Sequence, residues 1–384
     1  MATPGGRPSS PPGRAGASAG WGPPGPGRSL RRAAAAPAAP AGAGTVVVGD
    51  IGGTNARLQL WEAGAGAAAA GRPLRAQVYP TQDYGSFQEA LSEFLEGAEA
   101  PRAGAFAVAG PIEGDHERCD MPNCGWTLDA AEISAACRLG VVKLLNDFEA
   151  VGYGVPSVAP DMIVDIHAGE TVAKGPKVVL GPGTGFGQAQ LFWNEDWGTY
   201  QVYPSEGGHA DFSPRGWKQR QLNQHVEALL GCCETEHVCC GDGLVRIYDF
   251  LRTDQGSHRA GVAAPDLDAP GVSRAALADP AAGGGAEDNP LAREAVDIFL
   301  SILGQEAGNW GLRSLATGGV YIAGGITPRL RGRVELGEMR NAFLHRKSRF
   351  TEVLQKLPLK LVLDGDVGLL GAREYARNAL RLFD

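Results

Sequence analysis

The chain has 384 residues, too many for one compact core and enough for two domains with a cleft between them. Its 43 acidic and 35 basic residues give a net charge of −8, which argues against a nucleic-acid partner because phosphate backbones are bound through basic surfaces. No apolar run approaches the length of a membrane-spanning helix, so the sequence predicts no membrane segment and favours catalysis or small-ligand binding.

Residues 1–44 differ from the rest of the chain. They hold five arginines, no lysine and no acidic residue, and most of the remainder is Gly, Pro and Ala, so they cannot bury a core. A basic, acid-free, alanine-rich segment with several serines is typical of a transit peptide, which would direct the protein to a plastid or a mitochondrion. A biased extension that targets nothing, on a cytoplasmic protein, explains the composition equally well.

The first element of the folded part is "VVVGDIGGTNARLQLW", residues 46–61. A buried strand leads into a glycine turn, and alternating apolar residues then predict a second strand. Residues 177–193, "KVVLGPGTGFGQAQLFW", repeat this arrangement, with Thr54 and Thr184 in corresponding places of the turns. An internal repeat of one unit, spaced about a domain apart, predicts two related domains that each carry a hairpin.

The two glycine turns are candidate phosphate sites. Neither matches a Walker loop, and both lead into a strand instead of the helix that a Rossmann fingerprint requires. Backbone N–H groups at a tip without side-chain bulk can form an anion site, to which a Thr hydroxyl and an Asn amide add donors. An ordinary tight hairpin would explain the glycines but not Asp50, Thr54 and Asn55 at one tip. The carboxylate of Asp50 suits magnesium bound through water.

The middle of the chain supplies polar residues. Asn146 and Asp147 follow an apolar strand directly, "PSEGGHADF" contains Glu206 and His209, and Glu236 lies in "GCCETEHVCC". Such donors and acceptors suit a ligand rich in hydroxyls, such as a sugar, because each unpaired buried polar group costs about 1 to 3 kcal/mol. The alternatives are a helix N-cap for Asp147, a core imidazole for His209 and a solvated helix residue for Glu236.

The seven cysteines are an odd number without a secretory signal, which indicates reduced thiols. Zinc is one interpretation of the dense group formed by Cys232, Cys233, Cys239 and Cys240 around His237. The group lacks a C-x-x-C pair, and adjacent cysteines rarely surround a tetrahedral ion. We therefore expect these cysteines to be small packing residues.

The C-terminal half predicts a loop, a long helix and a third glycine turn. Residues 256–290 are rich in Gly, Pro and Ala around a short helical "SRAALAD", which favours a surface excursion, and residues 290–314 have the apolar spacing of a core helix. A strand at 320–323 then precedes Gly324 and Gly325, where bare backbone can approach a ribose or a flat ring.

Five motifs in order, "VGDIGGTNARLQL", "LLNDFEAVG", "GPGTGFG", "SEGGHADF" and "GGVYIAGGITPR", resemble those of the bacterial-type ATP-dependent glucokinases. The resemblance covers most of residues 45–384, including "GLLGA" near the C-terminus. It implies an α/β, two-domain, actin-like (ribonuclease H-like) sugar kinase fold with glucose in the cleft and magnesium-ATP beside it. The small domain would be 45–156 plus 365–384 and the large domain 157–364, and the family leans towards a homodimer.

The resemblance also implies roles for single residues. Asp147 would be the general base and, with Asn146, Glu206 and His209, a sugar contact; aligning "GDGL" places Glu236 on a further sugar-binding position. The residues implied to hold the nucleotide are Gly49, Asp50, Ile51, Gly52, Gly53, Thr54 and Asn55, then Gly183, Thr184 and Gly185, with Gly324 and Gly325 near the adenosine.

The expected activity is transfer of the γ-phosphoryl group of ATP to the 6-hydroxyl of glucose, giving glucose 6-phosphate and ADP for glycolysis. A kinase for a different hexose and a non-catalytic hexose sensor of the same fold are the alternatives. An actin-like ATPase would not need the E-G-G-H cluster, and a repressor would need a helix-turn-helix segment, which the tail does not offer.

Overall fold

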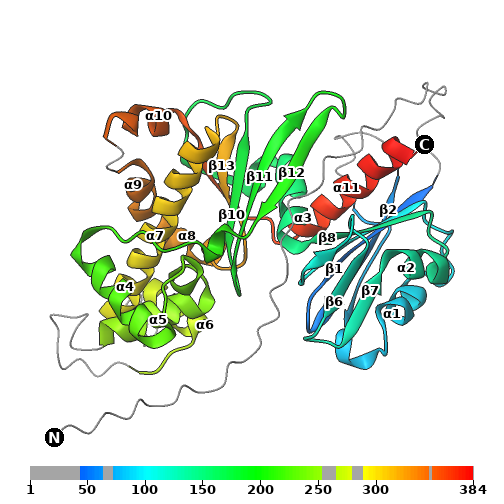
Figure 1. Ribbon diagram of the computed structural model, residues 1–384, viewed down its shortest axis with the longest axis horizontal. Coiled ribbons are helices and arrows are strands. Elements are labelled where there is room, and N and C mark those ends of the chain that lie inside the picture. Colours follow the sequence, from blue (N-terminus) through cyan, green and yellow to red (C-terminus); the bar gives the residue numbers. More distant parts are fainter. Residues whose placement is uncertain (1–43, 64–71, 253–264, 279–288, 346–347, 384) are drawn as a thin grey trace, which may run out of the picture. The chain divides into compact units, whose positions relative to one another are not determined.

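The computed structural model describes residues 44–63, 72–252, 265–278, 289–345 and 348–383 (Figure 1). The targeting prediction concerns residues 1–44 and therefore lies almost wholly outside the described part of the chain. The predicted excursion at 256–290 is described only at α6 (Ala269–Leu277) and its flanks, where the expected short helix is confirmed.

The N-terminal part of the fold is built on a five-stranded sheet. Its strands are β1 (Thr45–Ile51), β2 (Asn55–Glu62), β3 (Arg75–Pro80), β4 (Ala103–Val108) and β8 (Val141–Asn146). They lie in the order β3-β2-β1-β4-β8; β1, β2 and β3 are antiparallel neighbours, whereas β4 and β8 continue the sheet in parallel with β1. Every residue of β4 is buried, which accounts for its uninterrupted run of small and apolar residues.

Two short helices and a small sheet share a core with the five-stranded sheet. They are α1 (Phe87–Phe94), α2 (Ala130–Cys137) and a three-stranded sheet of β5 (Ile112–Glu113), β6 (Arg118–Met121) and β7 (Trp126–Asp129). Ser86 caps α1 by accepting a hydrogen bond from the Glu89 N–H, and the apolar face of the helix enters the core through Phe87 and Phe94.

A second sheet repeats the first. Its strands are β9 (Ile163–His167), β10 (Lys177–Pro182), β11 (Phe186–Asn194), β12 (Thr199–Ser205), β13 (Gly319–Ile322) and β14 (Leu359–Val362). The order β12-β11-β10-β13-β14 has the same strand directions as the first sheet, and β9 adds an antiparallel edge. The predicted internal repeat is thus confirmed at the level of sheet topology.

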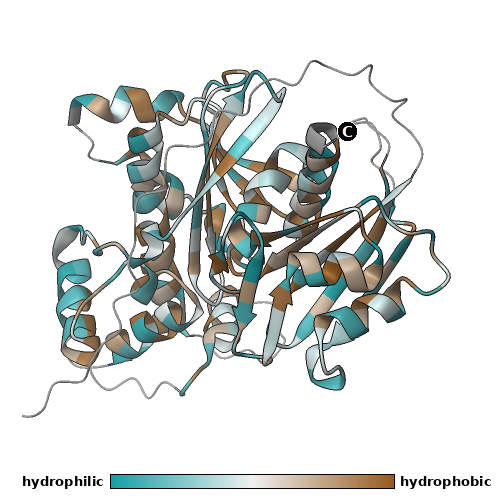
Figure 2. Cartoon of the chain, turned by 45° about the vertical axis from the view of Figure 1, so that its right-hand side comes forward, coloured by the Kyte–Doolittle hydropathy of each residue, from teal (hydrophilic) through white to brown (hydrophobic). Residues whose placement is uncertain are grey.

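A layer of helices packs on the second sheet. The central member is α7 (Pro290–Ser314), at the predicted position; most of its residues are buried, and it packs on α5, α6 and α9 as well as on β10 and β13. Figure 2 shows apolar residues concentrated along the strands. The other helices are α4 (Gly216–Leu230), α5 (Gly241–Arg252), α8 (Arg331–Val334), α9 (Glu338–Leu344) and α10 (Thr351–Lys356).

Two helices meet beside the first sheet. α3 (Asp147–Gly154) follows β8 without a gap, and α11 (Val367–Phe383) packs on both α3 and the strands β1 and β4. Their backbones touch at glycines: a Cβ atom on Gly371 would lie 1.6 Å from the carbonyl oxygen of Ala150, and one on Gly154 would lie 1.9 Å from that of Val367. This close approach gives a packing reason for the "GLLGA" motif.

The strand predicted at 320–323 and the returning C-terminal helix are confirmed. Pro328 opens a single 3₁₀ turn, Thr327–Leu330, that continues into the four-residue α8. Across the described ranges, the helices are too short or too polar to cross a bilayer. The division into domains at 156 and 365 stays a prediction.

Candidate active site

A cleft of about 500 Å³ is lined by Asp50 and Arg57 of the first hairpin, by the turn of the second hairpin, by the β8–α3 junction and by the residues around the start of α11. Its volume lies within the usual range for a site that binds a small molecule. Eleven predicted site residues line it: Asp50, Asn146, Asp147, Gly183, Thr184, Gly185, Glu206, His209, Glu236, Gly324 and Gly325. The structure therefore brings together residues that are up to 275 positions apart in the sequence (325 − 50).

The β8–α3 junction positions Asp147. The helix N-cap is Asn146, whose Oδ1 accepts hydrogen bonds from the N–H groups of Phe148 and Glu149 at 2.9 and 3.1 Å. The alternative in which Asp147 is the cap is therefore wrong, and its carboxylate stays available to a ligand in the cleft. Because Oδ1 of Asn146 is used by the helix, its amide nitrogen is the group left for a ligand.

The environment of Asp147 shifts the pKa of its carboxyl. Loss of hydration raises the pKa of its carboxyl above the usual range, although a hydrogen bond from the Phe148 N–H, at 2.8 Å, opposes this shift. The negative charges of Asp50 and Glu206 raise the pKa further. A carboxylate whose pKa is shifted towards neutrality in a cleft is a better proton acceptor than a solvated aspartate.

The glycines of the second hairpin accommodate the side chain that follows Asp147. A Cβ atom on Gly181 or on Gly187 would lie 2.3 Å from ring atoms of Phe148, and these two glycines are cross-strand partners in β10 and β11. Only glycine at both positions lets the ring lie against the hairpin. Gly181 and Gly187 thus position α3, whereas the turn at Gly183 has open space around it.

Gly187→Ala is expected to push the Phe148 ring away and to displace Asp147. A misplacement of about 1 Å can cost 10²-fold in rate, so we expect kcat to fall roughly 10- to 100-fold with a smaller change in the Michaelis constant for the sugar. Steady-state kinetics measure this. Adding Phe148→Leu to the variant should restore part of the activity, because the smaller side chain relieves the overlap; a wild-type rate for Gly187→Ala alone would contradict the positioning role.

In the first hairpin, Asp50 is paired with an arginine that the sequence interpretation missed. Arg57 stands directly opposite Asp50 in the β1–β2 register and donates Nη2 and Nε to its Oδ2 at 2.5 and 3.1 Å. The same guanidinium donates Nη1 to Asp366, just before α11, at 2.8 Å. Arg57 lines the cleft. Its position two residues after Asn55, close to the first glycine turn, is the feature of the sequence that could have identified it as a site residue.

The surroundings of Asp50 are compatible with the predicted magnesium ion. Both hydrogen bonds from Arg57 go to Oδ2, which leaves Oδ1 for a hydrated cation, and Asp147 lines the same cleft. Magnesium in nucleotide sites is commonly bound through one or two carboxylates together with substrate phosphates and water. Nowhere in the part of the chain that the structure describes do three metal-ligating side chains gather, so a resident ion held by protein alone finds no site there.

Six predicted nucleotide residues do not line this cleft. Gly49 and Ile51 are buried in β1, and Ile51 belongs to the core below the sheet. Gly52, Gly53 and Thr54 form the turn beyond it, and Asn55 is the first residue of β2. Four residues separate the last paired positions of the first hairpin, Ile51 and Ala56, and only three separate Pro182 and Phe186 of the second. Although the turns differ in length, Thr54 and Thr184 each lie two residues before the first paired residue of the second strand, Ala56 or Phe186, as the sequence comparison expected.

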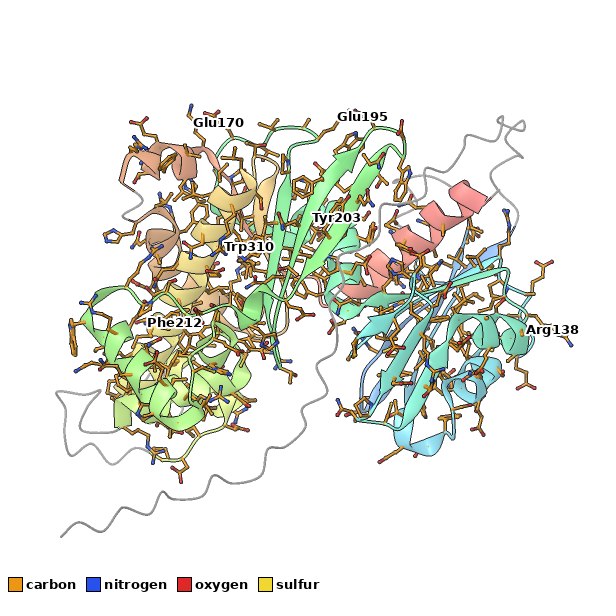
Figure 3. All side chains as sticks on the ribbon, in the orientation of Figure 1. Arg138, Glu170, Glu195, Tyr203, Phe212 and Trp310 are labelled. Carbon is orange, nitrogen blue, oxygen red and sulfur yellow. The ribbon has the colours of Figure 1, made fainter. Side chains whose placement is uncertain are left out.

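The side of the cleft formed by Glu206, His209 and Glu236 has its own supports. Glu236 accepts a hydrogen bond from the Phe186 N–H at 2.7 Å, so it is fixed beside the second turn. Gly207, next to Glu206, lies against the amide of Gln188, which accepts a hydrogen bond from Trp310 at 2.7 Å. Trp310 lies on α7 (Figure 3). His209 is exposed, and its Nδ1 is 2.8 Å from Glu234 Oε2. The core-imidazole alternative for His209 is therefore wrong.

The cysteine segment supports this side of the cleft. Cys233 and Cys239 belong to the core under the second sheet, as expected of packing residues, and Cys240 is also buried, whereas Cys232 is exposed and does not meet the expectation. The Phe212 N–H donates to the Cys233 carbonyl at 2.9 Å, and the Phe212 ring enters the same core. The segment therefore joins the loop that carries Glu206 and His209 to the body of the fold.

A second cavity of about 840 Å³ adjoins the cleft at the turn of the second hairpin. Gly183 and Thr184 line both cavities. The remaining walls come from α5, α6 and the segment after β13, and include Val245, Ile326 and Arg329. The cavity combines apolar walls with a few charged groups, as binding sites for small molecules usually do.

Comparison with known proteins identifies the family. The sequence model described as Glucokinase matches residues 47–379. The chain belongs to the glucokinase family. It is 35% identical to the glucokinase of Chromohalobacter salexigens over 335 residues, covering 86% of this chain and 97% of that protein. It is 31% identical to the glucokinase of Mesorhizobium japonicum over 336 residues, covering 87% and 92%.

A solved structure agrees with this family. The crystal structure of glucokinase from an Antarctic psychrotroph is 28% identical and superposes with a TM-score of 0.76, covering 87% of this chain and 99% of that one. The predicted fold class, an α/β protein of the actin-like sugar kinase type, is confirmed. The roles of single site residues stay predictions that rest on the motifs and on the geometry of the cleft.

Proposed function

We propose that this chain is a glucokinase that transfers the γ-phosphoryl group of ATP to the 6-hydroxyl of glucose. The observation that carries the proposal is the cleft itself, which is lined by Asp147, by the E-G-G-H residues Glu206 and His209, and by the glycine turn at Gly183. Family membership and the curated glucokinases in several bacteria support the same activity.

In the proposed mechanism, Asp147 accepts the proton of the attacking hydroxyl. Its position at the N-terminus of α3 is fixed by the Asn146 cap and by the packing of the Phe148 ring against Gly181 and Gly187. The base therefore needs little reorganisation during transfer. A positioned general base typically contributes about 10²- to 10⁴-fold. The amide nitrogen of Asn146, with Glu206, His209 and Glu236, would bind the remaining sugar hydroxyls.

The phosphates would lie between the two hairpin turns. The N–H groups of the turn at Gly183–Gly185 supply donors, and Arg57 supplies a cation whose planar guanidinium suits phosphate oxygens. Magnesium, when bound at Asp50, supplies charge neutralisation on the phosphate oxygens. Thr54 and its neighbours would reach the phosphates if the cleft closes over its substrates, as kinases of this kind require to exclude water.

The adenosine would occupy the second cavity. Gly183 and Thr184 line both cavities. Gly324, which lines the cleft, has a φ of 87°, which favours glycine, and a Cβ atom there would lie 2.7 Å from the Pro182 carbonyl oxygen. A nucleotide whose phosphates lie at the hairpin turn could therefore extend its base towards Val245 and Ile326.

Turnover of ATP with and without glucose tests this function against its alternatives. A sugar-dependent rate supports the kinase, sugar-independent hydrolysis supports an ATPase, and glucose binding without turnover supports a sensor. We expect ADP formation to require a hexose, because water is a poor substitute for a sugar that would be held by five side chains. A survey of hexoses in the same assay identifies the preferred acceptor.

Three further proposals concern the protein's context. We propose that it feeds glycolysis and, on family resemblance, that it is a homodimer, which sedimentation of the purified protein tests. We also propose that residues 1–44 direct it to a plastid or mitochondrion; a fluorescent reporter fused to these residues tests this, and diffuse cytoplasmic signal would favour the untargeted extension.

A further inference from the structure

Glu234 contacts the cleft only through another side chain. Its Oε2 accepts a hydrogen bond from Nδ1 of His209 at 2.8 Å, and it does not itself line the cleft. The same oxygen lies 3.7 Å from Nε2 of His237, whose Nδ1 accepts a hydrogen bond from the Glu234 N–H at 3.2 Å. The carboxylate is therefore held between two imidazoles, of which only that of His209 reaches the cleft.

The backbone around Glu234 is fixed to the loop that carries His209. The Thr235 N–H donates to the Ala210 carbonyl and the Phe212 N–H to the Cys233 carbonyl, both at 2.9 Å. The side chains of Cys233 and Thr235, on either side of Glu234, are buried. A carboxylate on so constrained a segment can set the orientation of its partner, whereas the His209 side chain is 54% exposed.

We propose that Glu234 is a positioning residue that sets the orientation and tautomer of His209 and thereby the affinity for the hexose. The hydrogen bond to Glu234 engages Nδ1, so Nε2 is the ring nitrogen left for a sugar hydroxyl. Without the carboxylate, the ring could rotate and either nitrogen could carry the proton. This inference rests on the proposed function, in which His209 contacts the sugar.

The charges around His209 make the role measurable. The hydrogen bond to Glu234 is the largest cause that raises the pKa of His209; partial burial opposes it, and the charges of Glu236 and Glu206 act in the same direction as Glu234. His237 lies near the same oxygen of the Glu234 carboxylate, and the pKa of Glu234 is lowered chiefly by its hydrogen bond with His209. Removing the charge at position 234 should therefore move the titration of His209 to lower pH.

Two variants and a matched control test the proposal. Glu234→Ala removes the partner of Nδ1, and we expect the Michaelis constant for glucose to rise about tenfold while that for ATP changes little, since one charged hydrogen bond is lost on the sugar side. Glu234→Gln keeps the shape and removes the charge; we expect the acidic midpoint of kcat/KM for glucose to move to lower pH. Asp211→Asn removes a neighbouring exposed carboxylate and should change neither quantity.

Several results would overturn the proposal. They are an unchanged glucose Michaelis constant in Glu234→Ala, an unchanged midpoint in Glu234→Gln, or the same changes in Asp211→Asn. If Glu234→Ala does not fold, the nearly isosteric Glu234→Gln still decides through its pH profile. Calorimetric titration of glucose measures the same affinity without turnover, so a wild-type chain that binds glucose but transfers no phosphoryl group would refute the proposed function and leave this inference decidable.

Discussion

Asp147→Asn is expected to lower kcat by about 10²- to 10⁴-fold, which corresponds to about 2.7 to 5.4 kcal/mol of lost transition-state stabilisation. The amide keeps the shape of the side chain at the start of α3 and can still contact a sugar, but it cannot accept the proton of the attacking hydroxyl. The glucose dissociation constant should therefore change far less than kcat. Steady-state kinetics and calorimetric titration of glucose measure the two quantities separately.

The control for this variant is Asp161→Asn, which also removes one carboxylate but lies at an exposed position outside the cleft. It should keep the wild-type rate. A wild-type rate in Asp147→Asn would remove Asp147 from the mechanism, and equal losses in the two variants would show that net charge, not the base, is responsible.

Asp147→Asn should not lose stability. The folded state raises the pKa of Asp147, so between the unfolded and folded pKa values the folded protein binds more protons and stability falls as pH rises. Above both values, the ionised carboxylate beside Asp50 and Glu206 costs stability, and asparagine removes that cost. Thermal unfolding at pH 7 should give a Tm for Asp147→Asn at or above that of the wild type.

Gly371→Val is expected to have the largest effect on folding. The Cβ atom alone would lie 1.6 Å from the Ala150 carbonyl oxygen and 2.6 Å from the Gly154 nitrogen, and both of these are backbone atoms of α3 that cannot rotate away. Overpacking commonly costs about 1 to 3 kcal/mol, and a backbone collision should exceed that range. Because a domain is stable by only about 5 to 15 kcal/mol, we expect little folded protein at physiological temperature.

Gly368→Ala is the matched control on the same helix. Its Cβ atom would meet only the Val151 side chain, at 3.9 Å, an ordinary contact. Alanine also favours a helix over glycine by about 0.5 to 1 kcal/mol, so this variant should be as stable as the wild type or slightly more stable. Circular dichroism during thermal unfolding compares the variants. A wild-type Tm for Gly371→Val would mean that α3 and α11 do not pack as described.

Regular elements with strong local signals could be predicted from the sequence. The helix at 290–314 was recognised from apolar spacing, and the two hairpins from β-branched runs around glycine turns. The sheet order could not be read in this way, because the pairing of β1 with β4, or of β10 with β13, joins segments that are far apart in the chain. Local patterns carry no information about such partners.

The site could be predicted only in part, again because local patterns do not show contacts between segments that are far apart in the chain. Polar residues after strands and the glycines of turns stand out, and eleven of these predicted residues line one cleft. Gly181 and Gly187 also look like phosphate-turn glycines, yet they face the Phe148 ring, which only the tertiary structure brings to them. Glu234 was missed because its significance comes from a contact with His209, 25 residues earlier in the chain.

The most direct test of the central claim is to follow the γ-phosphoryl group itself. Wild-type protein and Asp147→Asn would be incubated with glucose and ATP carrying a γ-phosphoryl label, and the products separated. We expect label on the 6-oxygen of the sugar with the wild type and almost none with the variant over the same time. Label released as inorganic phosphate, or equal transfer by both proteins, would contradict a hexose kinase in which Asp147 is the base.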